Sequence, residues 1–385
     1  MRLTSTPKLE DDQNFANLDK AIERDLDGIK KKMAAGRLTM RFGPRVVSTF
    51  LYAQKLQELH DLLNRSQDSN QIAGFIRKNF DFYEVYGGDR WGEVFVTGYY
   101  EPVLEGRLKE TGRFTAPILT LPKDAVSVEL AQFAQAGVYV GCAQQDVKRC
   151  TQVSTAKANR WPVLHGRLVS NRNGVKQVQP FEPREGIVSS PLIKGETHVI
   201  AWVDPIDAFF LQIQGSGRIE LPTQQIYVTY AGENGYPYVP IGKFVMDKIP
   251  KDQMTKQKLE QYLRSLSETD AEKLMDQNQS YVFFEKVPRE ARTELGVTAT
   301  SGRTIATDTQ LFAKGALAYL EFEKPVGSGF KHSHRFVLDQ DTGGAIRGAG
   351  RVDLFVGRGA EADEESGAMR APGRLYYLVP KTANE

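Results

Sequence analysis

The stretch DQDTGGAIRGAGRVDLFVG, residues 339–357, decides which fold and which chemistry the sequence can hold. It contains two runs of strand-forming residues around a glycine-rich turn; the first run carries Asp341 and the second carries Asp353. If both strands belong to one barrel, the turn can bring the two aspartates to the same rim. Apolar neighbours would desolvate a carboxyl group there, and desolvation raises its pKa, as a general acid requires. In the alternative interpretation, both aspartates only accept hydrogen bonds from turn amides.

Length and composition indicate an ordinary globular chain. The 385 residues exceed what one hydrophobic core usually organises, so we expect two domains. Hydrophobic residues make up 41% and charged residues 25%, which is typical of globular proteins. A formal net charge of +2 gives no excess of positive charge to displace the counterions of a nucleic acid. We therefore expect no nucleic-acid partner.

The two cysteines indicate in which cellular compartment the protein works. Cys142 and Cys150 lie eight positions apart in a polar segment, which favours a local disulfide in an oxidising compartment over two unrelated thiols. No apolar run approaches the roughly 20 residues that span a bilayer. The first residues, MRLTSTPKLEDDQNF, lack the apolar centre of a signal peptide. The sequence thus favours a mature form without its leader over a cytoplasmic protein.

The predicted elements form a helical beginning followed by a long β-rich part. Apolar residues recur at helical spacing over residues 14–35, and further helices are predicted over 46–66, 69–86 and 256–279. Strands are predicted over residues 91–108, 197–203, 208–221, 225–232, 280–286, 303–308, 317–323, 334–344, 351–357 and 373–381. Short strands at spacings of roughly ten residues favour a barrel or a sandwich.

Most alternative chemistries lack their sequence signature. The glycines of residues 343–350 do not form a nucleotide-binding G-x-G-x-x-G pattern. Only one Asp-Thr-Gly occurs, whereas an aspartic protease needs two carboxylates that share a proton. No G-x-S-x-G nucleophile elbow is present. His332 and His334 alternate as strand residues would, but the segment fits a solvated loop better than a metal site. We expect neither a metal nor an organic cofactor.

Two aromatic segments favour a carbohydrate ligand. TGYYEP and FFLQIQGSG combine aromatic rings with amide and hydroxyl groups beside glycines, and sugars bind to apolar ring faces and paired hydrogen-bonding groups. The alternative is core packing. In that case, alternation along a strand would send one ring of each aromatic pair inward, in Tyr99–Tyr100 and in Phe209–Phe210.

Five motifs together resemble the lytic murein transglycosylase A family. They are FVTGYYEPVLEGR (95–107), DPIDAFFLQIQGSGRIEL (204–221), YAGENGYPYVPIGK (230–243), NQSYVFFE (278–285) and the run from SGRTIATD to RLYYLVP, and they span roughly residues 90–380. The carboxy-terminal part also resembles a barrel domain named for three aspartates, here Asp308, Asp341 and Asp353.

The resemblance implies a mainly β fold with amino-terminal helices. We expect a double-psi β-barrel domain built from residues 1–105 and 281–385. A smaller β domain, residues 106–280, is inserted between these segments, and a groove is expected to run between the two domains.

The resemblance also implies an activity. Members of this family cleave the β-1,4 bond between N-acetylmuramic acid and N-acetylglucosamine and leave 1,6-anhydromuramoyl ends. Asp353 is then the catalytic acid and base, with Asp341 and Asp308 in supporting roles. The spacing of the first two aspartates is 353 − 341 = 12, where the family pattern leads us to expect eleven, and the extra residue falls within GAGR. Candidates for holding the glycan are Thr97, Tyr99, Tyr100, Gln212, Gln214 and Ser216.

The same resemblance implies a periplasmic monomer that acts on peptidoglycan glycan strands. It also implies an outer-membrane lipid anchor on an amino-terminal cysteine, which this chain does not contain. Two other functions stay open: a glycan hydrolase that uses Asp353 and Asp341 as acid and base, and a non-catalytic wall-binding barrel.

Overall fold

The computed structural model describes residues 1–88, 90–129, 163–188, 198–288, 292–327, 329–343 and 346–381. Cys142 and Cys150 lie outside these ranges, so the disulfide stays a prediction. Within the described ranges, every helix is too short or too polar to cross a membrane.

The amino-terminal helices are largely as predicted. They are α1 (Leu18–Ala34), α2 (Thr49–Arg65) and α3 (Ser69–Asn79), and α1 buries the apolar stripe that its spacing indicated. The ends of two predictions are wrong. Residues 46–48 belong to β3 (Arg45–Ser48), which pairs with β2 (Thr39–Phe42), and Phe80–Glu84 forms β4, which pairs with β1 (Arg2–Thr4). In each case alternating, β-branched or aromatic residues pair with a neighbouring strand.

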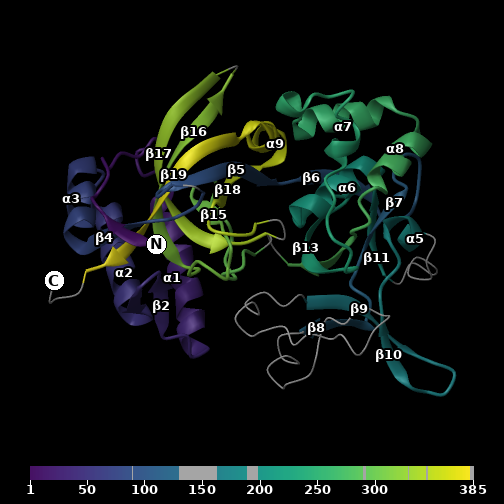
Figure 1. Ribbon diagram of the computed structural model, residues 1–385, viewed down its shortest axis with the longest axis horizontal. Helices are drawn as coiled ribbons and strands as arrows, with labels where there is room; N and C mark the ends of the chain where they lie inside the picture. The colour runs from purple at the N-terminus through teal and green to yellow at the C-terminus, as the bar shows by residue number, and fades with distance from the viewer. Residues whose placement is uncertain are drawn as a thin grey trace, which may run out of the picture.

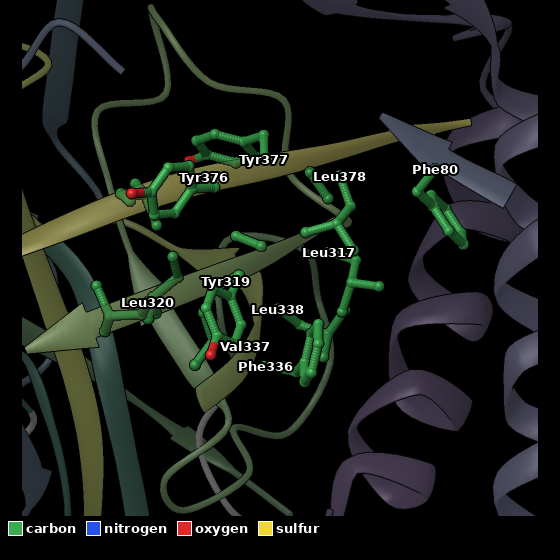
Figure 2. Close-up of a cluster of buried hydrophobic side chains, with 14 of the residues drawn as sticks. Phe80, Leu317, Tyr319, Leu320, Phe336, Val337, Leu338, Tyr376, Tyr377 and Leu378 are labelled. Carbon is green, nitrogen blue, oxygen red and sulfur yellow. The ribbon is translucent and has the colours of Figure 1, made fainter. Parts of the chain in front are cut away.

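Six strands close into the first barrel. In order around the ring they are β19 (Arg370–Pro380), β16 (Ala316–Val326), β17 (Gly329–Asp341), β15 (Thr304–Ala306), β18 (Arg351–Arg358) and β5 (Glu93–Glu101), and β5 pairs again with β19. Strands β4 and β1 extend this sheet beyond β19, and α1 to α3 lie at the same end of the molecule (Figure 1). Figure 2 shows buried side chains of β16, β17 and β19 clustered beside the helices.

A second six-stranded sheet stands beside the first. Its order is β14 (Val282–Val287), β13 (Gln225–Glu233), β12 (Ser216–Glu220), β6 (Val103–Arg107), β11 (Val199–Val203) and β7 (Ala116–Leu119). A bridge between Thr120 and Phe284 joins its two ends. A small sheet of β8 (Ala125–Glu129), β9 (Val163–Ser170) and β10 (Lys176–Gln179) lies on this side of the molecule (Figure 1).

The remaining helices are short. They are α5 (Arg184–Val188), α6 (Pro205–Gln214), α7 (Lys256–Ser265), α8 (Glu268–Met275), α9 (Gly359–Ala368) and the 3-10 turns η3 (Ile241–Phe244) and η4 (Lys251–Gln253). The predicted helical segment 256–279 is confirmed as α7 and α8. Helix α9 has no counterpart among the predictions.

The strand predicted over residues 208–221 is wrong in its first half, which is helix α6. The Asp204 carboxylate caps this helix by accepting the Ile206 and Asp207 N–H groups, and Pro205 occupies its first turn. Gly215, at φ +80°, ends it. Phe209 and Phe210 are both buried in the helical packing, so the expected inward and outward alternation of this pair is also wrong.

The chain passes between the sheets twice. It leaves the first barrel at Pro102, between β5 and β6, and returns between β14 and β15 (Figure 1). The division into residues 1–105 with 281–385 and residues 106–280 stays a prediction; sheet membership favours a second boundary after Val287. The two parts also touch where the Lys256 Nζ atom of α7 lies 2.6 Å from the Asp363 carboxylate of α9.

A buried ion pair fixes the amino-terminal segment to the first barrel. The Arg303 guanidinium donates to both carboxylate oxygens of Asp11, at 2.6 and 2.8 Å, and neither side chain reaches solvent. The same guanidinium donates to the backbone oxygens of Ala16 and Phe336. Four of the five N–H groups of the guanidinium are thereby bonded within the fold.

We expect Arg303→Met to destabilise the protein by about 3–5 kcal/mol, because the substitution leaves the Asp11 carboxylate buried without its cation. Urea unfolding followed by circular dichroism measures the effect. Arg90→Met is the matched control, since Arg90 and Glu93 form an exposed pair 3.7 Å apart, and it is expected to cost less than about 1 kcal/mol. Equal losses in the two variants would contradict the anchoring role of Arg303.

Candidate active site

Strand register places three polar side chains in one row. Ala306 of β15 pairs with Asp341 of β17 on one side and with Asp353 of β18 on the other. Asp353 pairs in turn with Thr97 of β5. Directly opposite residues on neighbouring strands project to the same side of a sheet. The structure therefore brings the two aspartates together, as the sequence led us to expect.

This row faces the interior of the barrel. The Tyr99 hydroxyl of β5 donates to Asp341 Oδ2 at 2.8 Å. In the ring of six, β5 and β17 lie opposite one another, so this hydrogen bond spans the barrel. Tyr99 and Thr97 alternate on the same side of β5, and Asp353 is opposite Thr97. The side chains of the row thus converge at the barrel interior.

Asp353 is held by a cation and a hydroxyl group. Its carboxylate accepts Arg351 Nε at 2.9 Å and Arg351 Nη2 at 3.1 Å, and it accepts a short hydrogen bond from the Thr97 hydroxyl. The Asp353 side chain is 13% exposed and the Arg351 side chain is 37% exposed, so solvent reaches the pair. A bidentate guanidinium stabilises an ionised carboxylate.

The surroundings of Asp353 match the expected apolar environment only in part: Phe355 lies on its side of β18, with its ring centroid 5.1 Å from that of Tyr99. Val352 and Leu354 are buried, and alternation along β18 turns them to the opposite side of the strand from Asp353. The same alternation brings Arg351, two positions earlier, to the side of Asp353. Because residues two apart on a strand share a side, the motif Arg-Val-Asp could have predicted the Arg351–Asp353 pair. The sequence analysis missed it.

Asp341 has a different environment. Its Oδ1 atom accepts the backbone N–H groups of Glu294 at 3.1 Å and Thr342 at 2.9 Å, while Oδ2 accepts the Tyr99 hydroxyl. Burial raises the pKa of the Asp341 carboxyl group, although these three donors act in the opposite direction. Burial is therefore the larger influence on the pKa of the Asp341 carboxyl group.

Asp308 ties two loops together. Its Oδ1 atom accepts the Gln310 N–H group at 3.0 Å, and Oδ2 accepts the Gly348 N–H group at 2.7 Å. Gly348 belongs to the turn between β17 and β18. At Gly350 in the same turn, an added Cβ atom would lie 1.6 Å from the Gly87 oxygen. The close approach of the Gly87 backbone explains why residue 350 is a glycine.

The other candidates for holding a glycan lie away from this row. Tyr100 is buried on the other side of β5, where its ring centroid lies 5.7 Å from Lys256 Nζ. Gln212 is buried on α6, and its side-chain oxygen has no hydrogen-bond partner among the described residues. Gln214 and Ser216 are half-buried at the junction of α6 and β12. Of the six candidates, only Thr97 and Tyr99 contact the aspartates.

Tyr238, in the loop after β13, was not singled out in the sequence. Burial raises the pKa of its hydroxyl group, and the charges of Arg184 and Arg351 lower it. The effect of Arg351 means that this loop of the second sheet comes near the Arg351–Asp353 pair. Tyr238 is nevertheless 46% exposed.

Two histidine rings lie close together on the first barrel. His332 and His334 lie on β17 and not in the expected loop, with their ring centroids 4.5 Å apart, and His332 Nδ1 lies 2.8 Å from Glu323. Across the described ranges, no set of three or more histidine, cysteine or acidic side chains is arranged to hold a metal ion. The chemistry available at the row is proton transfer by a carboxyl group.

Comparisons with known proteins match most of the chain. The MltA specific insert domain matches residues 95–285, and the 3D domain matches residues 303–379. The membrane-bound lytic murein transglycosylase A of Escherichia coli K12 is 27% identical over 336 residues, which cover 84% of this chain and 75% of the relative.

Solved structures share the fold. A membrane-bound lytic murein transglycosylase from Agrobacterium tumefaciens superposes with a TM-score of 0.70 at 24% identity, over 95% of this chain and 93% of that one. E. coli MltA with bound chitohexaose gives a TM-score of 0.68 at 21% identity, over 99% and 94% of the two chains. At this identity the similarity establishes the fold.

We expect Asp341→Asn to raise the melting temperature at pH 7. Because burial raises the folded pKa of Asp341 above its ordinary value of 3.8, ionisation of this group disfavours the folded state as the pH rises past that value. The amide does not ionise, so the advantage of the variant should disappear as the pH falls toward 4. Thermal unfolding between pH 4 and pH 8 measures it. A variant that is less stable at pH 7 would show that the three donors outweigh burial.

Proposed function

Because this chain belongs to the lytic murein transglycosylase A family, we propose that it cleaves the β-1,4 bond between N-acetylmuramic acid and N-acetylglucosamine in peptidoglycan. The products are glycan strands with 1,6-anhydromuramoyl ends. The enzyme is thus a peptidoglycan lytic transglycosylase, a lyase in which one carboxyl group, Asp353, serves as acid and then as base.

The contrast between the two aspartates carries this proposal. Asp353 is held by two side chains, Arg351 and Thr97, and its own side chain is 13% exposed. Asp341 accepts hydrogen bonds on both oxygens, two of them from backbone N–H groups that cannot move away. A hydrolase would need Asp341 to activate water as the second carboxylate. Three donors fixed by the fold, two of them backbone N–H groups, argue against that role.

The reaction requires no second carboxylate. Protonated Asp353 gives its proton to the bridging oxygen as the bond from that oxygen to C1 of the muramoyl residue breaks, leaving an oxocarbenium-like centre. The Asp353 carboxylate then takes the proton of the C6 hydroxyl group, and O6 forms a bond to C1. Asp353 ends the cycle protonated. Attack within one sugar ring gains the rate advantage of an intramolecular reaction.

The neighbours of Asp353 have separate tasks in this scheme. The Arg351 guanidinium and the Thr97 hydroxyl stabilise the carboxylate that exists between the two proton transfers. Tyr99 and Asp341 form the wall of the barrel interior and keep the carboxyl group of Asp341 out of the reaction. Asp308 supports the site indirectly, by holding the turn that precedes Arg351.

We propose that the glycan lies in a groove between a double-psi barrel and the inserted domain. The effect of the Arg351 charge on the Tyr238 hydroxyl group supports this, because it brings a partly exposed loop of the second sheet near the reactive pair on the first. The chitohexaose held by the E. coli structure of the same fold also supports a glycan ligand. Gln212, Gln214 and Ser216 are proposed to contact sugars farther from Asp353.

A location in the Gram-negative envelope fits the relatives, which are named membrane-bound. We propose that the enzyme works in the periplasm as a monomer and is anchored to the outer membrane by a lipid. Its partner there is the peptidoglycan strand.

We expect Asp353→Asn to lower the rate of murein cleavage by at least about 10²-fold, because a single group supplies both proton transfers. Mass spectrometry of digested murein measures the products. Asp270→Asn, the same change at an exposed carboxylate of α8, is the control and should keep full activity. Wild-type products that carry added water would identify a hydrolase, and the absence of new ends would identify a binding barrel.

We expect the kcat values of Arg351→Lys and Arg351→Ala to show separately what the charge and the bidentate contact of Arg351 contribute. Lysine keeps the charge and loses the bidentate contact, so kcat should fall about 10-fold. Alanine removes both the charge and the contact, so kcat should fall by about 10²-fold. Steady-state kinetics on murein test this. An unchanged kcat in Arg351→Ala would reduce Arg351 to a structural residue.

A further inference from the structure

A cavity of about 500 Å³ lies beside the first barrel and has no part in the scheme above. Its walls come from the end of α1, from β2 and from the loop that follows Asp308. This volume is in the range of small-molecule and peptide pockets. The residues that matter for its chemistry are Lys32, Arg37, Arg41, Glu294, Thr309 and Gln310.

The cavity is positively charged. Lys32, Arg37 and Arg41 line it with the single acid Glu294; Lys314, also in the wall, is bound to Asp339 at 2.7 Å. Within the described ranges, Arg37 and Arg41 form no ion pair. Burial lowers the pKa of Lys32, and the nearby charge of Arg37 lowers it further. An anion bound here would relieve that repulsion.

The walls of the cavity also hold the aspartates of the active site. Glu294 lines the cavity, and its backbone N–H group donates to Asp341. Gln310 lines the cavity, and its N–H group donates to Asp308. Two segments that line the cavity therefore also hold site aspartates through backbone hydrogen bonds. An extended peptide spans about 3.3–3.6 Å per residue, which sets how far a substituent of the sugar at Asp353 extends.

We propose that this cavity binds carboxylate groups of the peptide carried by the muramoyl residue, so that the enzyme prefers peptide-bearing glycan to bare glycan. The inference rests on the proposed function. Guanidinium groups pair with carboxylates in a bidentate geometry, which suits Arg37 and Arg41. The side chains of Thr309 and Gln310 can pair with the peptide backbone. Because the peptide is covalently attached to the muramoyl residue, its carboxylate is favoured over a free anion as the ligand.

The test compares two substrates in one assay. Murein glycan strands are used with their peptides and after an amidase has removed the peptides, and kcat/KM is measured from the anhydro ends that form. We expect the wild type to prefer the peptide-bearing strands about 10-fold. The double variant Arg37→Gln/Arg41→Gln should lose this preference and keep its activity on bare strands.

The control is Arg65→Gln/Arg77→Gln, which removes the same charge from exposed sites on α2 and α3. It should keep the preference. A second measurement needs no variant: higher salt should reduce the preference of the wild type, because it screens the charges in an open cavity. If the double variant does not fold, the salt dependence of the wild-type preference decides the question.

Three results would overturn the inference. The wild type could cleave both substrates equally, or the double variant could keep the preference. The double variant could also lose binding to phosphatidylglycerol vesicles with an unchanged peptide preference, which would assign the cavity to a lipid phosphate. Each of these outcomes leaves the proposed function intact. Failure of the wild type to form anhydro ends from either substrate would instead contradict the proposed function.

Discussion

Closure of the first sheet between β5 and β19 is the constraint on which the site depends. A closed ring of six strands fixes which residues point inward, since a slip of one residue would turn every side chain to the other face. The three-residue strand β15 sits between β17 and β18, and its Ala306 separates the two aspartates. A methyl group there fills little of the space into which both carboxylates project.

Asp341 and Asp353 differ in their hydrogen-bond partners, although they lie in the same row of the barrel. The partners of Asp341 are backbone N–H groups and a tyrosine across the barrel, all fixed by the fold. The partners of Asp353 are a half-exposed arginine and a threonine. A group that must lose and regain a proton in each cycle needs neighbours that tolerate both states. Side chains, which can adjust as the carboxyl group loses and regains its proton, satisfy this better than a fixed backbone does.

The sequence predicted those parts of the fold that follow from local pattern. The spacing of apolar residues located α1, and the alternating runs located β18 and β19, because these signals are written in consecutive residues. It also paired Asp341 with Asp353 through their shared turn. The helix at residues 205–214 was missed because its apolar residues suit a strand equally well, although the Asp204–Pro205 start and Gly215 end were visible.

Contacts between distant segments were beyond such prediction. The span from Tyr99 to Asp341 depends on ring closure, and the approach of Tyr238 to Arg351 depends on how the two sheets meet. The surroundings of Asp353 were predicted as apolar because its sequence neighbours are apolar, yet Val352 and Leu354 point to the other face, and Phe355 shares its side and packs on Tyr99. The sequence shows which functional side chains the protein has. Which of them are in contact depends on how the strands and loops pack.

A crystal structure of the Asp353→Asn variant with a bound murein fragment tests the central claim most directly. The account predicts that the side chain at position 353 lies within about 2.6–3.2 Å of the bridging oxygen. The C6 hydroxyl group of the muramoyl residue should lie within reach of the same side chain. A glycosidic oxygen positioned at Asp341, or one bound outside the row of Thr97 and Asp353, would contradict it.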